Sequence, residues 1–117
     1  MSSINRAAVI LKPRAPFLKW VNDADPNPNA HPLTMDDLQK EPTVYLIPEF
    51  DSDEEAAELV KAGYEILFEN VLLDWYTDES LWPKNRTYEM FCRWFDYSVY
   101  SIVLDLVDAP LIREEED

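Results

Sequence analysis

Glycine, cysteine and histidine are almost absent from this sequence of 117 residues, with one of each. A single glycine cannot build the glycine-rich loop that cradles phosphate groups, which excludes nucleotide chemistry of that kind. A single cysteine, Cys92, excludes an internal disulfide and a cysteine-based zinc site. The fold must therefore be stabilised by packing, and the lack of disulfides favours a cytoplasmic location.

Positive charge and long apolar runs are also scarce. Ten Lys and Arg residues stand against 24 Asp and Glu residues, which gives a net charge of −14. A field of this sign repels phosphate backbones and anionic lipids, so we expect no direct nucleic-acid binding. No stretch approaches the roughly 20 apolar residues of a membrane span, so we expect no membrane association and no export signal.

Enough apolar material remains for a packed interior, because 47% of the residues are hydrophobic. Periodicity and capping signals predict strands at 7–11, 43–47 and 97–107, and helices at 16–22, 35–40, 52–76 and 87–96. This order predicts an α/β (α+β) fold, a two-layer sandwich in which a small sheet of about three strands has helices packed on one face. Right-handed crossover would make the first two strands parallel if they are neighbours.

We predict one domain over residues 1–112, followed by a flexible acidic tail at 113–117. The clearest local signal is Ser52 with Glu55 three residues later, a capping box that starts the longest helix. Gly63 lies in the middle of that helix, where glycine is unfavourable. We therefore expect another backbone to approach it closely.

The residues with reactive side chains form no recognisable catalytic group. His31 lies in a proline-rich loop without a second histidine, so it is more simply an exposed residue than a metal ligand. Cys92 lies on the apolar face of its helix, where a buried, unreactive thiol is expected. The acids around residue 53 are explained by helix capping. The sequence therefore predicts no metal site, no cofactor and no catalytic residue.

Aromatic residues are concentrated in one stretch, with eight of the fifteen between positions 75 and 97. One thin helical layer would not bury them all, so we expect some rings to form an exposed contact patch. The alternative is that these rings fill the core between helices and sheet. The residues predicted to contact a partner are Trp75, Tyr76, Trp82, Tyr88 and Trp94.

Acidity, aromatic content and the lack of a catalytic group favour a non-catalytic protein-interaction domain. Its partner would be another protein or a second copy of itself in a homodimer, bound through an aromatic surface rimmed by carboxylates. An inhibitor-like or immunity-like role is one form of this hypothesis. A third possibility is that the chain is a structural subunit of a larger assembly.

The alternative is a small-molecule-binding domain or enzyme with a pocket between the long helix and the sheet. Cationic residues near the end of the first strand suit an anion there. The predicted ligand residues are Arg14, Lys19, His31 and Glu49.

Overall fold

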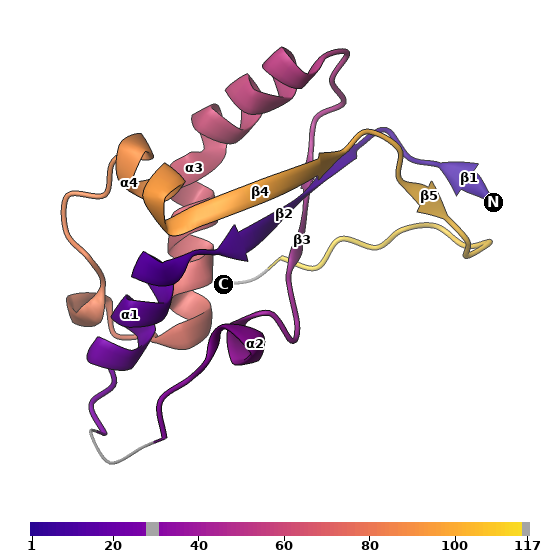
Figure 1. Ribbon diagram of the computed structural model, residues 1–117. Helices are drawn as coiled ribbons and strands as arrows, with labels where there is room; N and C mark the ends of the chain where they lie inside the picture. Colours follow the sequence, from indigo (N-terminus) through magenta and orange to yellow (C-terminus); the bar gives the residue numbers. More distant parts are fainter. Residues whose placement is uncertain (28–30, 116–117) are drawn as a thin grey trace.

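The computed structural model describes residues 1–27 and 31–115, in which helices and strands form a small α+β fold (Figure 1). In chain order the elements are β1 (Ser2–Ser3), β2 (Ala7–Pro13), α1 (Ala15–Asp23), α2 (Met35–Leu38), β3 (Val44–Ile47), α3 (Asp53–Trp75), the 3-10 helix η1 (Glu79–Leu81), α4 (Tyr88–Trp94), β4 (Phe95–Tyr100) and β5 (Leu104–Asp105). None of the described helices is both long and apolar enough to cross a bilayer.

The main sheet has three strands in the order β3-β2-β4, and both pairings are antiparallel. The prediction that the first two strands are parallel is therefore wrong. A parallel pair would need α1 to cross the face of the sheet. Helix α1 instead follows the end of β2 (Figure 1), where the amide of Arg14 donates to the carbonyl of Trp94 (2.8 Å). The chain then returns to β2 from the same end.

Helix α3 runs along one face of this sheet and supplies most of its cover (Figure 1). Side chains of Val9 and Leu11 from β2 point into a buried cluster with Val60, Phe68 and Leu72 from α3. Helix α4 and the start of β4 complete this cluster with rings that are almost fully buried. The prediction of a sheet with helices on one face is confirmed.

Local signals place the helix ends. Ser52 accepts a hydrogen bond from the amide of Glu55 (3.1 Å), which starts α3 at the predicted residue. The Glu55 carboxylate accepts from the amide of Asp51 (3.3 Å) rather than from that of Ser52, so only one of the two bonds of the predicted capping box is formed. Gly63 lies on this helix, but no atom of another element lies within 4 Å of the place where its Cβ would be. The expected close approach of a second backbone is therefore wrong, and the glycine leaves α3 with an unfilled position.

The last predicted strand, 97–107, is interrupted. Strand β4 ends at Tyr100, opposite Ala8, so only Ala7 of β2 remains beyond this pair and residues 102–103 have no partner in β2. The chain then forms β5, which pairs with β1 in a separate two-stranded ribbon. This ribbon lies beyond the start of β2 and the end of β4, at the end of the sheet opposite α1 (Figure 1). Residues beyond β5 are exposed up to position 115. The end of the predicted tail, residues 116–117, lies outside the described residues, as do positions 28–30 of the predicted loop.

Candidate functional site

The five aromatic residues predicted to contact a partner lie mainly in the interior. Trp82 is 9% exposed and the other four are half-buried. The indole Nε1 of Trp82 donates to the carbonyl of Tyr76 (2.8 Å), and the hydroxyl of Tyr76 donates to the carbonyl of Val21. These bonds satisfy the polar atoms of both rings inside the fold. The expectation of an exposed aromatic patch in this stretch is corrected.

Of the remaining three residues, Trp94 and Tyr88 join the network of ring contacts and Trp75 packs against the core. Trp94 contacts Phe68 with ring centroids 5.5 Å apart, and Tyr88 contacts Tyr64 at 5.6 Å. A hydrogen bond between Tyr88 and Cys92, together with burial, raises the pKa of Tyr88 to about 12. Trp75 lies half-buried at the end of α3, against the hydrophobic core. The alternative from the sequence, in which the rings fill the core, describes the structure better.

The four predicted ligand residues are all exposed and are not assembled into a pocket. The guanidinium of Arg14 donates to the carbonyl of Cys92 (3.0 Å), which ties α1 to α4. Lys19 forms an ion pair with Asp23 one helical turn away. His31 and Glu49 lie on loops. Both cations near α1 therefore have structural partners, and neither histidine nor glutamate contributes to a common site.

The outer face of the main sheet carries apolar side chains that no helix covers. Register and alternation place six residues there, and we call this surface the open face. It consists of Ala8, Ile10, Val44, Leu46, Ser98 and Tyr100. Val44, Leu46 and Tyr100 are exposed and Ile10 and Ser98 are half-buried, whereas the small side chain of Ala8 is buried between its larger neighbours. Leu46 and Tyr100 flank Ala8 in one row, and these two side chains are 52% and 50% exposed. Lys12 and Asp96 face each other at one end, so the centre of the face carries no charge.

A second exposed apolar surface lies on residues 101–115, which we call the arm. Its root is held by β5 and by a hydrogen bond from the amide of Ile4 to the carbonyl of Val103 (3.1 Å). Among the described residues, no hydrogen bond or ion pair joins 108–115 to the rest of the chain. The exposed apolar residues of the arm are Ile102, Leu104, Leu106, Val107, Leu111 and Ile112.

Sequence reasoning missed the open face, although a signal for it was present. Strands 7–11 and 43–47 are apolar at nearly every position, a pattern typical of strands that are buried on both faces. Helices cover only one face of the sheet in the structure. Continuous apolar strands beside a single helical layer therefore indicate that the second face receives its cover from elsewhere.

A cleft of about 580 Å³ lies between α2, α3 and the end of the sheet. Its floor is apolar and includes Phe17, Trp75 and Phe95. Charged residues stand at its margin, among them Asp37, Lys40, Glu41 and Asp74. The cleft occupies the place predicted for a pocket between the long helix and the sheet, but none of the four predicted ligand residues lines it.

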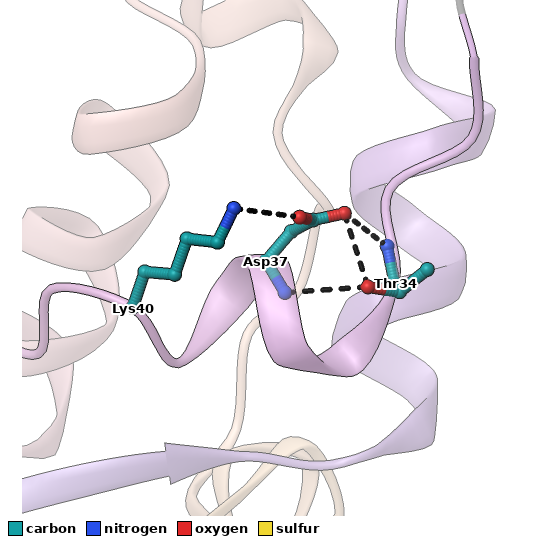
Figure 2. Close-up of polar contacts among 3 residues, drawn as sticks. All are labelled: Thr34, Asp37 and Lys40. Atoms are coloured by element: carbon teal, nitrogen blue, oxygen red, sulfur yellow. Dashed lines mark hydrogen bonds and ion pairs between the residues drawn. The ribbon is translucent and has the colours of Figure 1, made fainter.

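The polar groups beside this cleft are engaged in holding α2 (Figure 2). One oxygen of Asp37 accepts from the amide of Thr34 (2.8 Å) and from its hydroxyl (3.0 Å), while the other lies 3.3 Å from the ammonium of Lys40. Three hydrogen bonds lower the pKa of Asp37: in order of size, they come from the backbone amide of Thr34, the hydroxyl of Thr34 and the ammonium of Lys40. A carboxylate held in this way is a poor proton acceptor, so Asp37 is a capping residue rather than a base.

The phenol of Tyr45 also lines the cleft. Its hydroxyl donates to Oδ1 of Asn70 (2.7 Å), which links β3 to α3. Burial, and secondarily the negative charge of Asp74, raise the pKa of Tyr45 to about 12. The phenol therefore stays protonated at neutral pH. None of the described residues that line the cleft is a histidine, cysteine or serine.

Within residues 1–27 and 31–115, no three His, Cys, Asp or Glu residues lie together in a group suited to hold a metal ion. Comparisons with protein-family models, curated proteins and solved structures find no match to this chain. The choice of a function therefore rests on the open face, the arm and the cleft.

Proposed function

We propose that this chain is a non-catalytic protein-binding module of the cytoplasm that binds through its open face and its arm. One observation carries the proposal: the sheet is apolar on both faces, while helices cover one. Contiguous exposed apolar surface of this kind is typical of protein–protein contacts. Such a surface suits another protein or a second copy of the chain, and the net charge of −14 disfavours nucleic acid.

Charge adds a preference among protein partners. The centre of the open face is uncharged, whereas the molecule as a whole is strongly acidic, so a basic protein would be attracted from a distance and then held by apolar contacts. An inhibitor-like role, in which carboxylates take the place of phosphates on a basic surface, is compatible with this arrangement.

The test compares two leucines of similar exposure. Leu46 lies on the open face and Leu73 lies on α3, and they are 52% and 46% exposed. We expect the Leu46→Asp variant to lose a partner that purified wild-type protein and the Leu73→Asp variant both retain, when binding is measured by titration. Equal binding by both variants would contradict the proposal, and circular dichroism would verify that both are folded.

The cleft supports a second candidate function, the binding of a small molecule. Its volume of about 580 Å³ lies within the usual range for ligand sites. The apolar floor and the excess of carboxylates at the margin favour a compact apolar ligand, neutral or cationic. To test this, Val71→Trp would fill the cleft from α3. Ligand-induced stabilisation of the wild type that persists in this variant would contradict a site in the cleft.

A further inference from the structure

The amount of exposed surface is unusual for a chain of this size. A compact monomer of 13.7 kDa exposes about 6,600 Å², whereas this chain exposes 8735 Å². Its radius of gyration is 16.1 Å, against about 13 Å for a compact domain of 117 residues. The excess is about 2,100 Å² per chain, and burying it in two copies would remove about 4,000 Å², within the range of permanent homodimers.

The geometry points to a second copy of this chain as the occupant of the open face, and we propose that the two copies exchange arms, so that residues 101–112 of each lie across the open face of the other. This inference rests on the proposed function, because it takes the open face to be a binding surface. Each copy contributes one face and one arm, so a two-fold arrangement uses both surfaces twice and closes at the dimer.

The dimensions of the arm agree with this arrangement. Twelve extended residues span roughly 40 Å, while the seven residues of β2 span roughly 23 Å. The arm is therefore long enough to cross the whole face. The arm of the same copy does not cover its own face, because Ile112 is 85% exposed and Leu46 is 52% exposed in the structure.

The root of the arm also lacks support in a single copy. Strands β1 and β5 pair over two residues each, and an isolated ribbon of two strands is marginally stable in water. Leu104 in β5 is half exposed and would gain apolar contacts against another sheet. A second copy would therefore stabilise the ribbon together with the arm.

Charge restricts where two such acidic copies can meet. Each carries −14, so contact is favourable only where acids are sparse. The open face has no acid among its six residues, and residues 101–112 contain only Asp105 and Asp108. If the arm crosses toward the α1 end of the face, Glu114 and Glu115 reach the neighbourhood of Lys12, which has no ion pair among the described residues.

The first experiment measures mass by light scattering over a range of concentration and salt. We expect a dimer that salt strengthens, because salt screens the repulsion between two acidic copies. Leu106→Asp should weaken dimerisation by roughly 100-fold or more, since it places a charge in the apolar contact. Ile66→Asp is the matched control, because Ile66 on α3 is 76% exposed and Leu106 is 78% exposed. A monomeric wild type, or equal effects of both variants, would overturn the exchange.

The second experiment identifies the exchange by crosslinking. Val44→Cys and Ile112→Cys are prepared as separate proteins, each with Cys92→Ser, then mixed and oxidised. Val44 lies opposite Ile10, two residues from Lys12, as Ile112 lies two residues from Glu114. We expect a disulfide that joins one copy of each. A dimer that forms without this crosslink would overturn arm exchange in favour of another contact. A further variant carries both introduced cysteines in one chain. If this variant forms an intramolecular disulfide while the mixture of the two single variants gives no crosslink, each arm closes on its own face and the exchange is overturned.

Failure of this inference and failure of the proposed function give different results. If the wild type is monomeric while Leu46→Asp still abolishes binding of another protein, the open face is a binding surface for that protein and only the exchange is wrong. If Leu46→Asp changes neither mass nor binding, both proposals fail.

Discussion

The two faces of the main sheet differ in what covers them, although the same strands form both. On the inner face, Tyr45 and Val9 point toward α3 and lie among buried rings. On the outer face, their neighbour Leu46 is 52% exposed and Ile10 is half-buried, with no helix over either side chain. Apolar residues cost little on a face that is packed and are unfavourable on one that is not. The contrast shows that packing against the helices explains the apolar residues of one face only.

The largest expected effect on stability comes from truncating a leucine to alanine in the core, compared with the same truncation on the outer face of the sheet. Leu72 is 0% exposed and Leu46 is 52% exposed. We expect Leu72→Ala to lower the free energy of unfolding by about 2–5 kcal/mol, because it leaves a cavity in the core. Leu46→Ala should change it by about 0.5 kcal/mol or less in the monomer. Urea unfolding at low protein concentration measures both, and equal losses would contradict the difference between the faces.

Tyr45 provides a test of the inner face alone. Tyr45→Phe removes the hydrogen bond to Asn70 and should cost about 0.5–1.5 kcal/mol at neutral pH. The pKa of Tyr45 rises from 10.0 to about 12 on folding, so its contribution is complete below pH 10 and is lost as the pH rises to about 12. The stability difference between wild type and variant should therefore shrink above pH 10. A difference that stays constant over this range in urea unfolding would show that the phenol is not buried.

A smaller effect is expected at the start of the covering helix. Ser52→Ala removes the side chain that caps α3 and should cost about 1 kcal/mol of unfolding free energy. Ser101→Ala, on the exposed arm, is the matched control and should have an effect within about 0.5 kcal/mol. Thermal unfolding followed by circular dichroism distinguishes the two. Similar shifts in both variants would mean that the cap does not hold the helix.

Gly63 offers the smallest change and the opposite sign. No neighbouring atom lies within 4 Å of the position that a Cβ would take here, so Gly63→Ala should stabilise the protein by up to about 1 kcal/mol through higher helix propensity. The gain should appear as a raised midpoint in thermal unfolding. A loss of stability would contradict an open position at this residue.

Sequence patterns predicted most elements because these depend on nearby residues. Ser52 and Glu55 lie within one turn, so the capping box located the start of α3 correctly. The strand 43–47 is bounded by prolines, and β3 occupies Val44–Ile47. The direction of β3 was wrong, because it depends on whether α1 packs over the sheet or beyond its end. That choice involves Arg14 and Trp94, which are 80 positions apart.

The candidate sites were harder to predict than the fold. Aromatic content indicated exposed rings, but α1 and α4 together form a layer thick enough to bury them, and Trp20 contributes a further ring contact with Trp94. The break after Tyr100 was also missed, because it follows from the length of β2 rather than from residues 101–103. The exposure of a side chain depends on segments that are distant in the sequence, whereas a periodic pattern gives information only about the segment that carries it.

The position of β4 also has a consequence for how the protein is made. Val9 pairs with Val99, so the central strand waits for a neighbour synthesised some ninety residues later. Until then β2 and β3 form a hairpin-like pair beside α3, without Phe91 and Phe95 to fill the interior. A ribosome-bound chain shorter than about 100 residues would therefore expose both sides of its apolar strands, a state in which chaperone binding protects against aggregation.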